Sequence, residues 1–184
     1  MVVAVTMFAA GLLAWTFLEY AIHGWLSHRF VTFVTPLHQV HHRDPSAVFA
    51  LGAWLPTAAI FGLLLIGFGM TPATIFVAGL VAGFAIYELV HYRLHFAPAV
   101  GRFEARLRAR HLAHHLAMDD RCLGVTTALW DRIFGSAARP DDIAALAARL
   151  DQVEPIAGRS NLGRIVAGLR VSVKHHVSLS GGAK

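Results

Sequence analysis

Histidine is the residue type whose spacing in this sequence first suggests chemistry. The chain has 12 histidines, and most of them fall into four short groups. In chain order these groups are His23 and His28; His38, His41 and His42; His91 and His95; and His111, His114 and His115. Neutral imidazole binds zinc, iron, copper and nickel, so the grouping predicts a metal site without naming the metal. One ion would leave most of these ligands unused, so we expect two ions.

Helical periodicity accounts for most of these spacings. Residues three and four apart share one face of an α-helix, so we expect each histidine triplet to point one way and His91 to pair with His95. His23 and His28 are five residues apart, which an ideal α-helix separates by about 140°. This pair therefore requires a helix end or a π-bulge between its members. His175 and His176 lie in a polar tail, and we expect them to be structural.

The composition is that of a membrane protein. Of 184 residues, 56% are hydrophobic and 15% are charged, and the mean hydropathy is +0.55. A soluble domain has about a quarter of its residues charged. The net charge of +5 accompanies no recognisable nucleic-acid module, so we expect anionic lipid rather than nucleic acid as its partner. The only cysteine, Cys122, excludes an intrachain disulfide.

Three apolar runs are candidates for membrane crossings, over residues 2–22, 48–68 and 73–90. A spanning helix needs ~20 apolar residues. The first run lacks the basic start of a signal peptide, so we interpret it as a membrane helix. The short turn at 67–72 makes the other two an antiparallel hairpin. The predicted fold is an all-α membrane bundle of about three to four membrane helices with a cytoplasmic, histidine-rich helical cap.

One crossing followed by a hairpin brings all four histidine groups to the same membrane face. Every Lys and Arg lies at or after Arg29, so the positive-inside rule predicts that this face is cytoplasmic. We divide the chain into a membrane-embedded di-metal domain over 1–139 and a tail over 140–184. In the tail, 162–173 is expected either to lie on the membrane surface or to pack over the metal domain, and the end to be disordered.

Two carboxylates stand close to the histidines in sequence. Glu19 lies one helical turn before His23, and Glu88 lies three residues before His91. A ligating histidine usually donates its second ring N–H to a carboxylate or carbonyl, and an acid near the bilayer edge is costly without a partner. We therefore expect both acids to support ligand histidines, the alternative being a solvated helix end.

The ordered motifs "EYAIHGWLSH", "LHQVHH", "YELVHYRLH", "HLAHH" and "GVTTALWDRIFG", from Glu19 to Gly135, resemble the fatty acid hydroxylase/sterol desaturase superfamily. Within it the chain looks most like the fatty acid 2-hydroxylases. The resemblance implies a membrane-bound, non-haem di-iron oxygenase that uses O₂ and two electrons to hydroxylate a lipid C–H bond. Zinc can occupy such sites in purified material. Asp131, in "LWDRIF", matches a family position, and the resemblance implies that it supports the metal ligands; the alternative is a packing or capping role.

The family's metal ligands carry over to the ten histidines of the four groups: His23, His28, His38, His41, His42, His91, His95, His111, His114 and His115. Glu88 stands where the family often has Asp. No cytochrome b5-like domain is fused to this sequence, so electrons are expected from a separate donor such as cytochrome b5, a ferredoxin or a reductase. The expected location is the inner membrane of a bacterium or the endoplasmic reticulum of a eukaryote.

Several other functions fit parts of the pattern. The expected substrate is a fatty acyl or sphingolipid-like lipid, and the near alternative is desaturation or hydroxylation of a sterol or carotenoid. A membrane metal transporter or metal-binding protein is a different class, but transport ligands normally lie at mid-bilayer on broken helices rather than at helix ends. A haem protein would need only one or two axial histidines, which leaves most of the groups unexplained.

Overall fold

The computed structural model describes residues 1–48, 51–117 and 120–145. This described part contains helices and no strand, which confirms the all-α fold class. In chain order the elements are α1 (Val2–Tyr20), the π-helix η1 (Ala21–Arg29), α2 (Val34–Arg43), α3 (Leu51–Phe68), α4 (Pro72–Phe96), α5 (Gly101–Ala117) and α6 (Leu129–Phe134).

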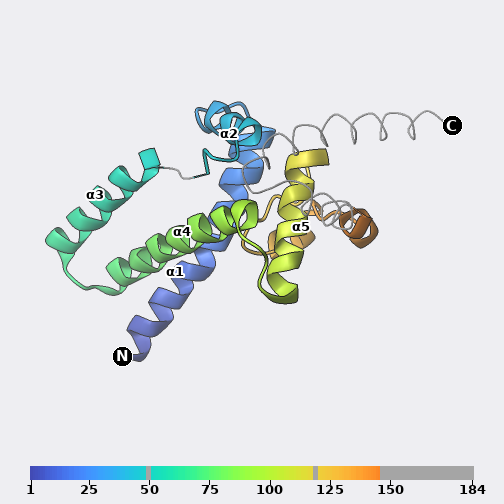
Figure 1. Cartoon of the computed structure of the whole chain (residues 1–184). Helices are drawn as coiled ribbons and strands as arrows, with labels where there is room; N and C mark the ends of the chain where they lie inside the picture. The colour runs from blue at the N-terminus through green and yellow to red at the C-terminus, as the bar shows by residue number, and fades with distance from the viewer. Residues whose placement is uncertain (49–50, 118–119, 146–184) are drawn as a thin grey trace.

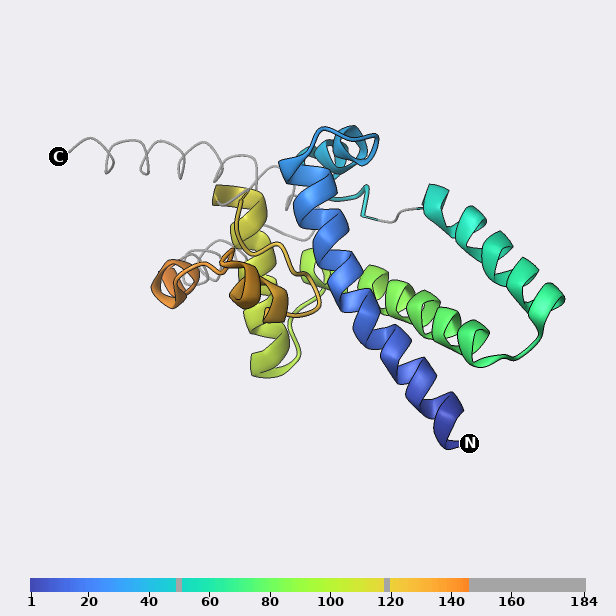
Figure 2. The same ribbon diagram turned by 180° about the vertical axis from the view of Figure 1, so that it is seen from behind.

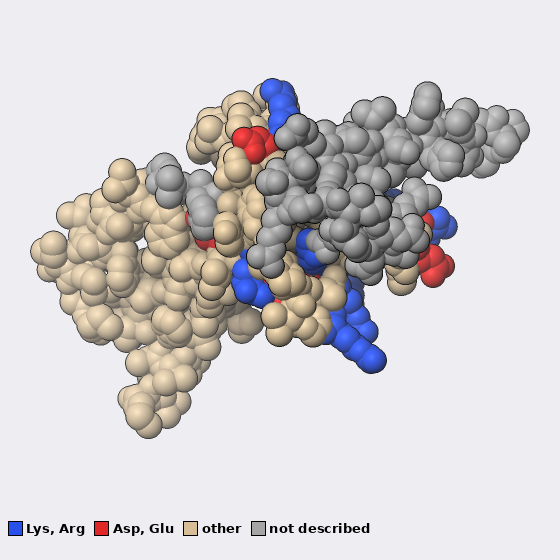
Figure 3. Space-filling model, in the orientation of Figure 1, with Lys and Arg blue, Asp and Glu red and all other residues tan. Residues whose placement is uncertain are grey.

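Two of the predicted crossings are long, apolar helices. α1 and η1 form one continuous helix of 28 residues over Val2–Arg29, and α4 has 25 residues. Both are long enough to span a bilayer. The apolar part of α3, Ala53–Phe68, is shorter, so its crossing stays a prediction. In Figure 3 the side formed by α3 and the start of α1 carries almost no charged residues, whereas the arginines gather at the other end.

Large apolar side chains on these helices face outward. Leu13 on α1 is 69% exposed, and Leu63 and Ile66 on α3 are 68% and 86% exposed. Contiguous apolar surface of this kind marks a contact with lipid or with another protein. Together with the helix lengths, it fits a chain whose α1, α3 and α4 are solvated by acyl chains.

α3 and α4 form the expected antiparallel hairpin (Figure 1). The turn uses Gly69 at a φ of +64°, in the left-handed region where glycine has no steric cost. Thr71 then caps α4, because its Oγ1 accepts a hydrogen bond from the amide of Thr74 at 3.2 Å, and Pro72 occupies the first turn. The cap sets where α4 begins and hence which of its residues reach the histidine end.

α1 crosses α4 closely, as both views show (Figure 2). Gly11 and Gly79 lie at the crossing, where a Cβ on either would collide with the backbone of the opposite helix. Small residues allow helices in a membrane to approach backbone to backbone. This contact fixes α1 against α4, and so aligns the two helix ends that carry histidines.

The polar end of the molecule is where η1, α2, α5 and the end of α4 meet (Figures 1 and 2). A small buried cluster of Leu94, Leu107 and Val125 joins α4, α5 and the segment before α6. All four histidine groups lie at this end, as expected from one crossing and one hairpin. Residues 140–145 are helical, and the remainder of the predicted tail lies outside the described residues.

The glycine crossing can be tested with Gly79→Ala. Its Cβ would meet the Phe8 carbonyl and the backbone of Gly11, which no side-chain rotation relieves, so we expect a loss of about 1–3 kcal/mol of stability. The measurement is the thermal unfolding midpoint in detergent. Gly62→Ala on α3 is the matched control, because nothing lies within 4 Å of its Cβ and alanine favours a helix. Equal midpoints for both variants would contradict the tight crossing.

Candidate metal centre

The histidines of the four sequence groups assemble into two groups in space. In each, one potential ligand atom per residue lies within 4.8 Å of all the others. The first histidine group consists of His23, His28, His38, His42 and His114. The second histidine group consists of His41, His91, His95, His111 and His115. Each group therefore has the size and ligand type of a site for one metal ion.

The two triplets are divided between the groups, which corrects the expectation that each points one way. His38 and His42, four residues apart on α2, join the first group, while His41 turns to the second. On α5 the pair His111 and His115 joins the second group, while His114 turns to the first. Each triplet thus contributes to both groups, and α2 and α5 lie between the two sites.

The five-residue spacing of His23 and His28 is accommodated by the π-helical turns of η1, the second of the two arrangements expected from the sequence. A π-helix bonds each amide to the carbonyl five residues earlier, and Phe30 N donates to Trp25 O at 2.8 Å. The Ser27 hydroxyl likewise donates to Ile22 O at 2.9 Å. The wider turn brings the two imidazole rings to 5.3 Å between centroids, so both reach the first group.

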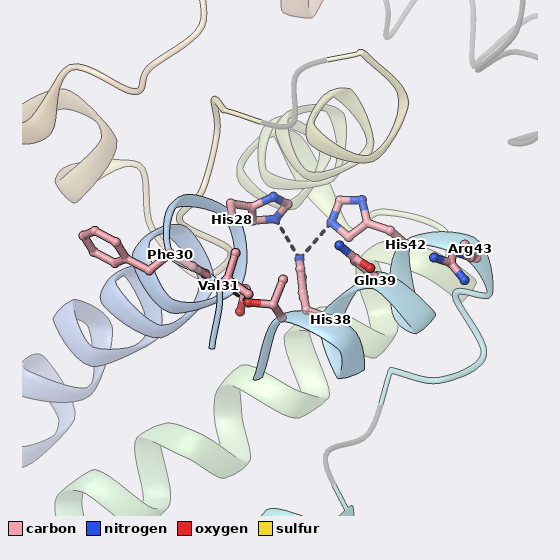
Figure 4. Close-up of a pocket in the computed structure, with 9 residues that line it drawn as sticks. His28, Phe30, Val31, His38, Gln39, His42 and Arg43 are labelled. Carbon is pink, nitrogen blue, oxygen red and sulfur yellow. Dashed lines mark hydrogen bonds between the residues drawn. The ribbon is translucent and has the colours of Figure 1, made fainter. Parts of the chain in front are cut away.

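Ring nitrogens converge at the centre of each group. In the first, His38 Nε2 lies 2.8 Å from Nε2 of both His28 and His42 (Figure 4). In the second, His95 Nε2 lies 2.8 Å from His111 Nε2 and 3.2 Å from His41 Nε2. A neutral imidazole nitrogen has either one proton or one lone pair, so five nitrogens at one point cannot all be satisfied by each other.

Burial keeps these imidazoles in the neutral form that binds metals. It lowers the pKa of His41 to about 4. For His111 and His115, burial and the neighbouring imidazoles hold the pKa well below the ordinary value of 6.5. Protonation would place several positive charges within one buried space, which costs both desolvation and repulsion. At neutral pH the groups therefore present lone pairs.

Two histidines show directly that a partner is required. Both ring nitrogens of His91 and of His115 are buried and have no hydrogen-bond partner among the residues that the structure describes. An unsatisfied buried polar atom costs about 1–3 kcal/mol. A cation at the centre of the second histidine group would satisfy one nitrogen of each ring, so the donor set fits a bound metal ion.

The two groups differ in their access to solvent. All members of the second histidine group are at most 4% exposed. The first includes His28 and His38, which are half-buried and line a pocket with His42, Phe30 and Gln39 (Figure 4). A small molecule can thus reach the first site from the pocket, whereas the second is enclosed.

The carboxylates selected from the sequence lie near the site but not all where expected. Glu19 was expected to face a ligand histidine; its Oε1 instead accepts from Val125 N at 2.7 Å and Thr126 N at 2.8 Å. Glu88, next to the second group in sequence, accepts from Trp54 Nε1 at 3.1 Å and so connects α4 to α3. Both are buried.

Asp131 is fully buried in α6, and it accepts from the amides of Leu123 and Gly124 at 2.8 Å and 3.0 Å. It also pairs with Arg110 at 2.5 Å. Asp131 therefore organises the backbone between α5 and α6, whereas the resemblance implied that it supports the metal ligands, with packing or capping as the alternative.

The histidine partners that sequence reasoning missed are backbone carbonyls in this connection. His23 Nδ1 lies 2.5 Å from Leu123 O, and His114 Nδ1 lies 2.9 Å from Arg121 O. Gly24 leaves room for the Leu123 side chain beside η1. The carbonyl of any residue can serve this purpose, so no residue type marks such a position in a sequence.

Comparison with known proteins gives consistent matches. The chain is 34% identical over 140 residues to a dihydroceramide fatty acyl 2-hydroxylase of Arabidopsis thaliana, covering 70% of this chain and 59% of the relative. It is 32% identical over 146 residues to a fatty acid 2-hydroxylase of Mus musculus, covering 72% and 39%. The chain therefore spans between about two fifths and three fifths of the length of these relatives.

A solved structure shares the fold. It is that of full-length scs7p, with only its hydroxylase domain visible, and it has a TM-score of 0.63 and 26% sequence identity. The match covers 75% of this chain and 57% of the other. The profile of the fatty acid hydroxylase family matches residues 8–136, which include every histidine of both groups. The chain belongs to the fatty acid hydroxylase family.

Proposed function

We propose that this chain is a membrane-bound di-iron oxygenase that hydroxylates carbon 2 of a fatty acyl chain. The observation that carries the proposal is the convergence of ten histidines on two centres, each with five ligand atoms within 4.8 Å. The names of the relatives, dihydroceramide fatty acyl 2-hydroxylase and fatty acid 2-hydroxylase, support the substrate class and the position attacked.

In this proposal each histidine group holds one iron ion. Iron bound there would supply O₂ activation, which amino-acid side chains do not provide. The imidazoles hold their neutral form and fix the ligand geometry, and the surrounding helices exclude bulk water from the second site. The overall reaction inserts one oxygen atom into the C–H bond. The other oxygen atom is reduced to water by two protons and two electrons, and the electrons come from a separate donor protein.

The arrangement of the apolar helices supports a lipid substrate. α1, α3 and α4 extend away from the histidine end (Figure 1), and their outward side chains are apolar. An acyl chain lying along these helices would place its polar head, and hence carbon 2, closest to the histidines. We propose that this end lies on the cytoplasmic side, as the arginine distribution predicts, with α3 as a further crossing.

The proposal is tested by iron content and lipid products. Anaerobically reconstituted protein is expected to hold two irons per chain, and cells that express it to accumulate a 2-hydroxylated acyl lipid by mass spectrometry. His114→Ala removes a ligand of the first group, and product is expected to fall at least as far as the ~10–100-fold loss typical of a ligand's hydrogen-bond partner. His38→Ala, at a less buried position, should act in the same way.

His175→Ala is the matched control, because its position in the polar tail predicts that it is not a metal ligand; this residue lies outside the part of the chain that the structure describes. It should keep two irons and full product. Undiminished product in both His114→Ala and His38→Ala would contradict the ligand assignment, and loss of product in His175→Ala would show that the two groups are incomplete.

The difference in burial predicts that the two ions leave at different rates. The first site opens to the pocket at His28 and His38, whereas the second requires local opening of the packed helices. We therefore expect a chromogenic chelator to remove metal in two phases, and its absorbance measures both. His28→Ala should abolish the fast phase and His91→Ala the slow one. A single phase that releases both ions would show that the sites are equally accessible.

A further inference from the structure

The connection between α5 and α6 touches the first histidine group and orients two of its members. Arg121 O faces His114 Nδ1 at 2.9 Å, and Leu123 O faces His23 Nδ1 at 2.5 Å. A ligand histidine that donates its second N–H has a fixed tautomer and ring orientation, with Nε2 free for a metal. We call residues 121–126 the carbonyl loop.

The backbone of the carbonyl loop is held in an unfavourable conformation. Cys122 has a φ of +56°, in the left-handed region that residues other than glycine seldom adopt. This turn lets the carbonyls on either side, those of Arg121 and Leu123, both reach histidines. A strained residue persists only when its surroundings hold it in place, so something must fix the loop.

Two buried carboxylates fix it from opposite ends. Asp131 accepts hydrogen bonds from the amides of Leu123 and Gly124. It also accepts one from the Ser136 hydroxyl at 2.7 Å, and that hydroxyl shares a hydrogen bond of 2.9 Å with the Tyr20 hydroxyl. Glu19, from α1, accepts from the next two amides and from the Thr126 hydroxyl at 2.5 Å. Each backbone amide from 123 to 126 therefore donates a hydrogen bond to one or the other of these two acids.

Three members of the second histidine group lack this support. Nδ1 of His91, His111 and His115 has no hydrogen-bond partner within the part of the chain that the structure describes. A shift of the carbonyl loop would therefore turn His23 and His114 and leave the second group in place. The two sites should respond differently to any change in the loop.

We infer that Glu19 and Asp131 are positioning residues which, through the carbonyl loop, set the metal affinity of the first histidine group and not of the second. The inference rests on the proposed metal centre. In this role the two acids act through the backbone: they fix the amides of the carbonyl loop, and the loop carbonyls orient His23 and His114.

The test is a Zn²⁺ titration of the full-length apoprotein in detergent, with a competing chelator to resolve two dissociation constants. In Glu19→Ala and in Asp131→Asn we expect one constant to weaken by about 10–100-fold and the other to stay unchanged. His38→Ala and His91→Ala identify the sites, since each removes a ligand from one group.

Double variants show which site responds. Asp131→Asn combined with His38→Ala should leave the remaining, second site at its normal affinity. Asp131→Asn combined with His91→Ala should leave only a weakened first site. If both sites weaken together, or neither does, the positioning role is overturned. A wild-type chain that binds fewer than two Zn²⁺ ions would instead contradict the proposed metal centre.

Two further variants separate positioning from general stability. Glu19→Gln keeps one carbonyl oxygen for the two amides and should restore most of the affinity that Glu19→Ala loses. Thr74→Val removes a buried hydroxyl at the far end of α4 and should lower the unfolding midpoint with both Zn²⁺ constants unchanged. A selective loss of affinity in Thr74→Val would overturn the assignment to the loop.

Discussion

Five imidazole nitrogens that meet within a buried space form the constraint on which this molecule depends. Without a cation they compete for the same protons, and protonating them would bring like charges together in a medium that solvates charge poorly. A bound metal ion removes both costs, because every lone pair then has the same acceptor. The helices around the groups thus close around a centre that is unfavourable when empty, and metal binding and folding are expected to be linked.

Helix geometry determines how one short segment serves two centres. A spacing of four residues places His38 with His42, and His111 with His115, on one line of a helix, while the residue between them is turned by most of a right angle. That turn sends His41 and His114 to the opposite centre. Two helices that lie between the centres can therefore supply ligands to both. In η1 the wider π-helical turns bring His23 and His28 to the same side of the helix.

Two of the buried acids, Glu19 and Asp131, act on the backbone. Glu19 and Asp131 each accept hydrogen bonds from two consecutive amides, which offsets part of the cost of burying a carboxyl group. These hydrogen bonds affect the histidines through the carbonyl groups of Arg121 and Leu123. Arg110 also pairs with Asp131. The same bonds connect α1 to the region before α6, more than 100 residues apart in sequence.

Residue types and spacings alone were enough to predict the helical class, the antiparallel hairpin, the gathering of the four histidine groups at one end, and either a helix end or a π-bulge between His23 and His28. These features follow from local periodicity, which the sequence contains directly. The division of the triplets and the partners of Glu19 and Asp131 were decided by tertiary structure. They depend on how α2, α5 and the carbonyl loop are rotated about α1 and α4, and that rotation comes from close packing between distant segments, which no local pattern records.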